Sequence, residues 1–204
     1  MSGLNIVSDF VDFYDTDESS GGVLYRRMSS ERLPKGRALS KLKSIGIHII
    51  DVGPVTKFDE SDGVLVVYTD VNKHDGKGKR VCTYNEAVTQ FRNFLASKYV
   101  ERLNGVTVKM LQVGKRTYKL TYVNKNKYSF DMGELVSVTR GSDGYNNILK
   151  LPIYSVDYIW DLDGAAYAVD FNEVQSLGKL GFSNFMSGAE IRSEIIDAIE
   201  FYSK

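Results

Sequence analysis

Three oxygen-bearing side chains near the end of the sequence have the types and the spacing of a metal-ion site. Asp157 lies within a strand-like run, SVDYI, and Asp170 and Asn172 end a second run, AVDFN. The tight turn between the runs predicts an antiparallel pair that brings Asp157 near Asp170. Residues two apart in a strand point to the same face, so Asp170 and Asn172 should do so. This pattern predicts a Mg²⁺ site, because Mg²⁺ prefers a few hard oxygen ligands, with water and nucleotide phosphates completing its shell.

The same residues also have a purely structural interpretation. Asp and Asn are common at strand ends, where their side chains form turns and cap helices. Short motifs produce many false matches, so the spacing alone leaves both interpretations open.

The composition is that of an ordinary folded protein. Of 204 residues, 43% are hydrophobic and 25% are charged, which excludes a disordered chain. The 26 basic and 26 acidic residues balance, so the net charge gives no strong signal for nucleic acid or a membrane surface. Cys82 is the only cysteine, which excludes a disulfide framework and a thiolate metal site. An acidic beginning and the lack of a ~20-residue apolar run predict a cytoplasmic protein with no membrane span.

The periodicity of apolar residues predicts an α+β fold. Residues 84–103 carry the clearest helical stripe, and Asn104-Gly105 is its predicted stop. A Ser-x-x-Glu capping box at residues 187–190 predicts a last helix. Helix and strand units come first and hairpins follow, which favours α+β over a doubly wound parallel sheet. A further helix is expected at 33–45, and strands are expected at 47–52, 64–68, 106–113, 117–123, 135–139, 154–160 and 165–171.

The run PIYSVDYIWDLDGAAYAVDFNEVQSLGKLGF, followed by a capped helix, resembles the C-terminal end of the ATP-grasp superfamily. In that family one strand carries an acidic metal ligand and a second strand ends in acid-x-Asn. The resemblance implies that Asp157 is the first metal acid and that Asp170 and Asn172 are the acid-x-Asn pair. It also implies ATP and Mg²⁺ as cofactors. The implied activity is that of an ATP-dependent ligase joining a carboxylate to an amine or another nucleophile, and the sequence does not identify the acceptor substrate.

The segment upstream, VKMLQVGKRTYKLTY, is similar to the family's preceding hairpin, which brings a basic residue toward the nucleotide phosphates. Lys109 is the closest positional match, and Lys119 lies on the returning strand. Lysine suits phosphate recognition because it carries a compact positive charge. A solvated lysine on an exposed strand face is the structural alternative for either residue.

The resemblance also suggests how the chain is divided. It covers the C-terminal half and hardly extends into the N-terminal half. We therefore expect an ATP-grasp-like portion at 105–204 and an N-terminal α/β portion, a small lobe, at 1–104. No linker separates the two by composition, so one compact unit is the alternative.

Departures from the family pattern keep a non-catalytic interpretation open. The sequence has no glycine-rich loop flanked by a Lys-Pro strand, and residues 124–133 lack the Arg-containing signature of many peptide ligases. The beginning, SDFVDFYD with VLYRR, resembles uncharacterised proteins of large bacteriophages. The alternative is a binding or regulatory phage protein, with a protein partner, on a degenerate ATP-grasp scaffold in the host cytoplasm.

Two further motifs have competing interpretations. Lys73 begins a KHDG run that fits the K-x-D-G pattern, in which nucleotidyltransferases use the lysine as a nucleophile on ATP. A solvated basic loop is the simpler interpretation of that run. Asp9, Asp12 and Asp15 would share one face of a helix and could hold a metal ion, although an acidic surface is the simpler interpretation.

Overall fold

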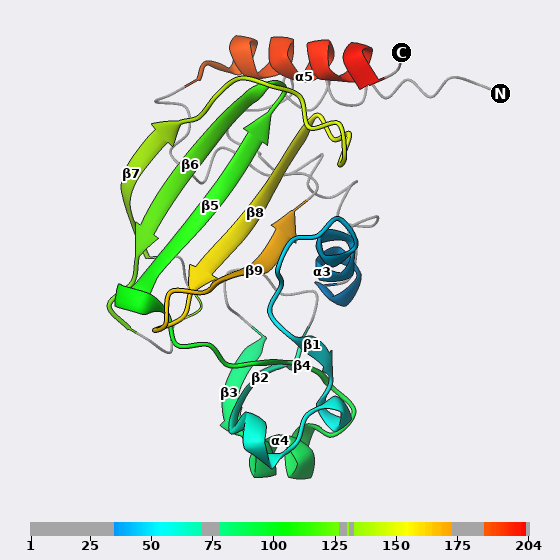
Figure 1. The fold of residues 1–204 in the computed structure, drawn as a ribbon, viewed down its shortest axis with the longest axis vertical. Coiled ribbons are helices and arrows are strands. Elements are labelled where there is room, and N and C mark those ends of the chain that lie inside the picture. Colours follow the sequence, from blue (N-terminus) through cyan, green and yellow to red (C-terminus); the bar gives the residue numbers. More distant parts are fainter. Residues whose placement is uncertain (1–34, 71–77, 127–129, 131–132, 173–185, 203–204) are drawn as a thin grey trace, which may run out of the picture.

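The structure is a computed structural model that describes residues 35–70, 78–126, 130, 133–172 and 186–202. These residues form two sheets with antiparallel strand pairing and three α-helices, which confirms the predicted α+β class. A five-stranded sheet makes the larger part, and a four-stranded sheet lies beyond one end of it (Figure 1). The helix α5 (Gly188–Tyr202) crosses the opposite end of the large sheet.

The large sheet is built almost entirely from hairpins. Its strand order is β7-β6-β5-β8-β9. The β5–β6 hairpin turns at Gly114, whose φ of 57° suits glycine. The strands are β5 (Val106–Val113), β6 (Arg116–Val123), β7 (Glu134–Arg140), β8 (Ile153–Trp160) and β9 (Ala166–Asn172).

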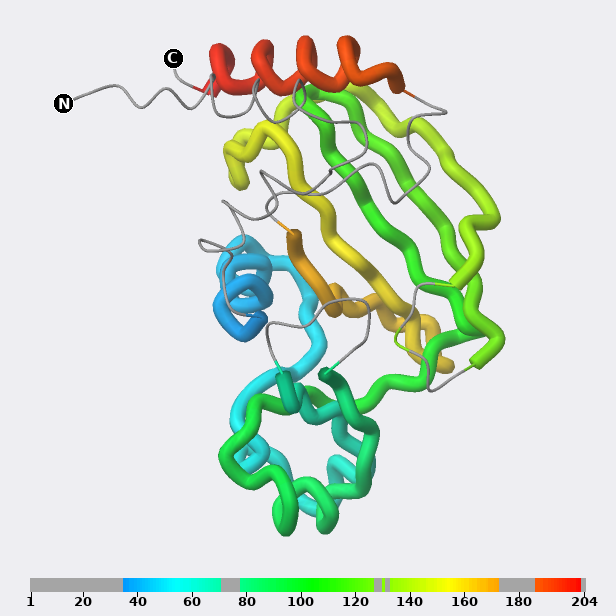
Figure 2. Tube along the Cα trace, turned by 180° about the vertical axis from the view of Figure 1, so that it is seen from behind, coloured from blue at the N-terminus to red at the C-terminus, as the bar shows by residue number. Residues whose placement is uncertain are grey.

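The two faces of the large sheet bury different sets of apolar side chains, because alternate residues of a strand point to opposite faces. On one face, Leu111 and Leu120 pack with Ile191 and Ile195 of α5, so we call it the α5 face. The other face packs against the helix α3 (Lys35–Ser44), so we call it the α3 face. Helix α3 lies beside the edge strand β9 (Figure 2). Its contacts on the α3 face are made by Ala38, Leu39 and Leu42 with Tyr154, Val156, Ala168 and Phe171.

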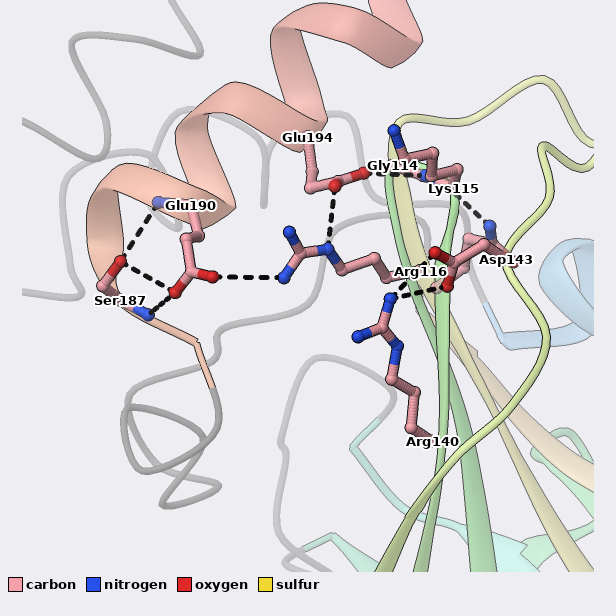
Figure 3. Close-up of polar contacts among 9 residues, drawn as sticks. Gly114, Lys115, Arg116, Arg140, Asp143, Ser187, Glu190 and Glu194 are labelled. Carbon is pink, nitrogen blue, oxygen red and sulfur yellow. Dashed lines mark hydrogen bonds and ion pairs between the residues drawn. The ribbon is translucent and has the colours of Figure 1, made fainter.

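Helix α5 is fixed to the β5–β6 turn by a polar network that we call the α5 anchor (Figure 3). Arg116 donates from Nε to Glu194 Oε1 at 2.8 Å and from Nη1 to Glu190 Oε1 at 3.3 Å. Lys115 donates its backbone N–H to Glu194 Oε2 at 3.2 Å. Ser187 and Glu190 form the predicted capping box, with Ser187 N–H donating to Glu190 Oε2 at 2.9 Å.

The small sheet has its own apolar core and one covering helix. Its strand order is β1-β4-β2-β3. The helix α4 (Tyr84–Phe91) is capped by Thr83 and Glu86 and buries Ala87 against the sheet. The strands are β1 (Val52–Pro54), β2 (Val64–Tyr68), β3 (Lys79–Thr83) and β4 (Leu95–Lys98), and short 3₁₀ turns occupy Val55–Lys57, Glu60–Asp62 and Leu103–Gly105.

Two of the predicted elements of the N-terminal half differ from the structure. The helix expected at 84–103 ends at Phe91, because the residues of β4 pair with both β1 and β2 in the small sheet. Ala96 and Ser97 are almost fully buried in that sheet, so tertiary contacts override the helical spacing. The strand expected at 47–52 is shifted to Val52–Pro54, and only an isolated parallel bridge joins Ile49 to Ala168.

The division expected at residue 104 stays a prediction. The small sheet spans residues 52–98, which lies within the expected N-terminal portion. Helix α3 precedes it in the chain and yet packs on β9 of the large sheet. The large sheet is therefore covered in part by residues from the N-terminal portion.

Candidate functional site

Strands β8 and β9 bring two acidic side chains to directly opposite positions. Asp157 pairs with Asp170, and Ser155 pairs with Asn172. A β-bulge interrupts the ladder between Asp157 and Tyr158, so Val169 is the extra residue on β9. The predicted closeness of Asp157 and Asp170 is confirmed by this register. Asn172 also donates from Nδ2 to Asp170 Oδ2 at 3.4 Å, so the three side chains form one group.

Lys109 belongs to the same group. It lies on the central strand β5, directly opposite Asp157 on β8. Its ammonium donates to Asp157 Oδ1 at 2.5 Å and to Ser155 Oγ at 3.3 Å. The whole residue is only 3% exposed, so this is a buried ion pair on the α5 face. Removing either partner of such a pair is destabilising, because the remaining charge would be buried alone.

Lys35 completes the group from outside the sheet. It is the first residue of α3, and its ammonium donates to Asp170 Oδ1 at 2.8 Å. The same nitrogen lies 5.6 Å from the ring centroid of Tyr68, which is the last residue of β2 in the small sheet. Tyr68 is fixed in turn by a hydrogen bond of 3.1 Å between its hydroxyl and Ser97 Oγ. Lys35 therefore contacts the large and small sheets at once.

The charges of the group shift the two carboxyl pKa values in opposite directions. Burial alone would raise the pKa of Asp170, but the charge and hydrogen bond of Lys35, with the charges of Lys79 and Lys109, lower it well below its ordinary value. For Asp157, burial is the largest influence and raises the pKa, while Lys109 opposes it and the charge of Asp170 adds to it. The two carboxyl groups are therefore not equivalent, because the environment favours the ionised form of Asp170 more than that of Asp157.

Tyr122 contributes a buried hydroxyl with no hydrogen-bond partner among the described residues. It lies on β6, on the α5 face, and is 6% exposed. Burial and the nearby charge of Asp157 raise the pKa of Tyr122 to about 12, so the hydroxyl stays neutral and within electrostatic reach of Asp157. Buried hydroxyls are normally hydrogen-bonded, and one without a partner indicates a position where a ligand or water can bind.

Lys119, the second lysine singled out by sequence, is not brought to this group. Lys119 pairs with Met110, so it lies on the α3 face, and it is exposed. A lysine in this position cannot act with Lys109 on the α5 face. The KHDG run at Lys73 and the acidic residues Asp9, Asp12 and Asp15 lie outside the described residues.

Sequence reasoning missed Lys35, Lys79 and Tyr68. Lys35 is one of several charged residues at the beginning of an amphipathic helix, and its spacing has no distinguishing mark. The sequence predicts an exposed loop at 72–79, whereas Lys79 begins β3 opposite Tyr68.

The donor set fits a hard divalent cation that is shared with a ligand. Two carboxylates and one amide oxygen come from neighbouring strands, and all three are oxygen donors. In the part of the chain that the structure describes, no cluster of three or more His, Cys, Asp or Glu side chains could hold a metal ion unaided. A metal here would therefore need oxygens from a bound ligand to complete its shell, as Mg²⁺ commonly does with phosphates.

The fold is similar to that of solved structures that include an ATP-grasp ligase. The structure of ATP-grasp ligase PsnB complexed with minimal precursor matches with a TM-score of 0.55 and 14% identity, over 84% of this chain and 61% of that chain. D-cycloserine synthetase DcsG matches with a TM-score of 0.51 and 15% identity, over 83% of this chain and 70% of that chain. The fold is therefore ATP-grasp-like, which confirms the fold predicted from the C-terminal residues.

Other comparisons set the limits of this similarity. No family model matches the chain, and no curated protein matches it. The chain spans about three fifths of the PsnB structures, with 60% covered in the complex with minimal precursor, Mg and ADP. Over the described residues, no helix is long and apolar enough to cross a membrane.

Proposed function

We propose that this protein is an ATP- and Mg²⁺-dependent ligase that joins a carboxylate to an amine or another nucleophile. The proposal rests on one observation, the grouping of charges around Asp157 and Asp170. Lys109 and Lys35 contact these carboxylates directly, and the charge of Lys79 also acts on Asp170. Three positive charges around two negative ones suit a polyphosphate, while the carboxylates suit the cation that accompanies it.

The fold supports the same proposal. PsnB, whose fold this chain resembles, is an ATP-grasp ligase with structures bound to Mg and ADP and to precursor peptide and AMPPNP. The group of charges also lies where the large sheet meets α3 and the small sheet, as the contacts of Lys35 with Asp170 and Tyr68 show. An acceptor that carries a carboxylate would be the second substrate.

Asp157, Asp170, Asn172 and Lys109 each have a role in this proposal. In the reaction, the acceptor carboxylate would attack the γ-phosphorus of ATP and release ADP, and the amine would then displace phosphate from the acyl carbon. Mg²⁺, when bound, would be held by Asp157, Asp170 and Asn172 and would neutralise phosphate charge. Lys109 would bind a phosphate oxygen as a buried ammonium. The burial of this ammonium would strengthen that contact by excluding water.

Nucleotide binding is the direct test. With ATP and Mg²⁺, isothermal titration should show saturable binding, and the melting temperature should rise with ligand concentration. Asp170→Asn should abolish both effects. The matched control is Asp143→Asn, which removes an exposed carboxylate paired with Arg140 and should bind ATP as wild type does.

Incubation with ATP and Mg²⁺ also separates the competing functions. ADP release that requires an added carboxylate acceptor would identify the ligase. If the wild-type protein ignores ATP and Mg²⁺ altogether, the ligase proposal fails and a non-catalytic binding protein on this scaffold takes its place. A covalent AMP adduct at Lys73, detected by intact mass after incubation with ATP, would instead support a nucleotidyltransferase.

A further inference from the structure

Both carboxylates of the group already hold a cation supplied by the chain itself. Lys109 Nζ lies 2.5 Å from Asp157 Oδ1, and Lys35 Nζ lies 2.8 Å from Asp170 Oδ1. The second oxygen of Asp170 accepts from Asn172 at 3.4 Å. A metal ion binding to Asp170 must therefore compete with an ammonium group that is already in place.

The two lysines differ in how easily they could give up their carboxylates. Lys109 lies in the middle of the sheet, and its side chain is 4% exposed beside an Asp157 side chain that is 12% exposed. Lys35 comes from the end of a helix, and its partner Asp170 lies on an edge strand with a side chain that is 35% exposed. The ammonium of Lys35, at the end of a flexible four-carbon side chain, donates to a single carboxylate oxygen of Asp170.

We propose that Lys35 is an exchangeable counter-ion, which holds Asp170 before nucleotide binds and moves to the nucleotide's phosphates when a divalent cation takes Asp170. This inference rests on the proposed function and adds a residue that neither the sequence pattern nor the comparisons assign. The exchange conserves charge pairing at every stage. Asp170 passes from an ammonium to a divalent cation, and the ammonium passes from a carboxylate to a phosphate.

The place of Lys35 between the sheets supports a phosphate as its second partner. Its ammonium lies over the ring of Tyr68, and Tyr68 is paired across the small sheet with Lys79. A phosphate chain lying between Lys79 and Lys109 would therefore pass beside Lys35. The ring of Tyr68 can keep attracting the ammonium while its anionic partner changes.

A purely structural ion pair makes a different prediction from an exchangeable one. If Lys35 only supports the fold, its removal can weaken metal binding and nucleotide binding but should strengthen neither. If Lys35 competes with the metal for Asp170, its removal should strengthen binding of the metal alone while weakening binding of the nucleotide. Opposite changes in the two affinities are therefore expected from the exchange and not from a purely structural ion pair.

The test uses Lys35→Met and Lys35→Gln in the full chain. Mn²⁺ alone, followed by electron paramagnetic resonance of the free ion, should bind about tenfold more tightly to both variants than to wild type, because the competing ammonium is gone. ATP with Mg²⁺, followed by isothermal titration, should bind about tenfold more weakly. The matched control is Lys119→Met, an exposed lysine on the α3 face, which should change neither affinity.

The outcomes separate this inference from the proposed function. If wild type binds no ATP, the ligase proposal fails, and the Mn²⁺ measurement still reports whether Lys35 competes for Asp170. If ATP binds but neither variant binds Mn²⁺ more tightly, the exchange is overturned and the ligase proposal stands. Lys35→Gln retains a hydrogen-bond donor for Asp170 in case Lys35→Met does not fold. Failure of both variants to fold, judged by circular dichroism, would overturn the exchange, because the contact would then be a permanent part of the fold.

Discussion

The large sheet carries two groups of opposite charges, and they are built in different ways. In the α5 anchor, one guanidinium, Arg116, binds carboxylates of both Glu190 and Glu194, and Glu194 also accepts a backbone N–H (Figure 3). The second group consists of Lys35, Lys109, Asp157 and Asp170, and we call it the lysine–carboxylate group. In it, each ammonium contacts one oxygen of one carboxylate. Both groups include a side chain that is less than a tenth exposed.

The difference separates a fixed contact from an exchangeable one. A guanidinium is planar and rigid and has several donors, so it holds two carboxylates in one geometry. An ammonium is a compact charge, so another cation can replace it at the same carboxylate oxygen. The α5 anchor is thus suited to hold a helix in place, and Lys35 in the lysine–carboxylate group is suited to change partners. The predictions below would sharpen or break this comparison.

The largest effect is expected at Lys109. Lys109→Met should lower the free energy of unfolding by about 3 kcal/mol, because it leaves the buried carboxylate of Asp157 without its partner. The double variant Lys109→Met/Asp157→Asn should return to within about 1 kcal/mol of wild type, since removing both charges also removes the cost of burying them. Urea denaturation measures both values. A double variant as unstable as the single one would show that this pair is structural, like the α5 anchor.

The close packing of α5 against Gly114 gives the next prediction. An added Cβ at Gly114 would lie 2.3 Å from the carbonyl oxygen of Glu194, and the residue has a φ of +57°. Gly114→Ala should therefore cost about 2 kcal/mol in the free energy of unfolding, through strain and displacement of α5. The matched control is Gly164→Ala, where φ is +86° but the space is open, and it should cost about 1 kcal/mol. Equal costs at the two positions would mean that α5 can move away freely.

The charge of Glu194 has a smaller expected effect. Glu194→Gln should lower the free energy of unfolding by about 1.5 kcal/mol, because the charge-assisted bond to Arg116 is lost while an amide oxygen can still accept from Lys115. ATP binding by the folded variant should remain that of wild type, as titration can check. Glu200→Gln, at an exposed position on the same helix, is the control and should leave stability unchanged. Loss of ATP binding in Glu194→Gln would break the separation between the two groups.

The smallest expected effect is the dependence of stability on acidic pH through Glu190 of the α5 anchor. The backbone and side-chain hydrogen bonds of Ser187, followed by Arg116, lower the pKa of Glu190 below its ordinary value of 4.5. Its stabilising contribution is therefore fully present above that ordinary value and is lost as pH falls through the lower, folded value. The difference in melting temperature between wild type and Glu190→Gln should shrink as the pH is lowered from 7 to about 3. A difference that stays constant over this range would exclude the charge of Glu190 as its source.

Local sequence signals predicted the parts of the molecule that depend on neighbours in the chain. The β5–β6 hairpin around Gly114 and the capping box at Ser187 are both present, because turn geometry and helix capping are decided within a few residues. Asp157 and Asp170 could be matched because one short turn joins their strands. The metal role assigned to them stays a prediction.

Contacts between distant segments could not be predicted in the same way. Ala96 and Ser97 fall within the helix expected at 84–103, yet they belong to β4, because pairing with both neighbouring strands outweighs local preference. Lys35 reaches Asp170 across 135 residues of sequence, and only the packing of α3 on β9 brings them together. A lysine that finds its role through packing has no local pattern to reveal it.

The bulge at Val169 gives the β8–β9 hairpin some tolerance to changes in length. Counting residues from the turn, where Trp160 pairs with Ala166, a regular ladder would set Val169 and not Asp170 opposite Asp157. The one-residue offset is what aligns the carboxylates. A hairpin one residue shorter, with Val169 absent, would keep the same alignment in an unbroken ladder. Variation in the length of this hairpin can therefore be absorbed at the bulge while the acidic residues keep their positions.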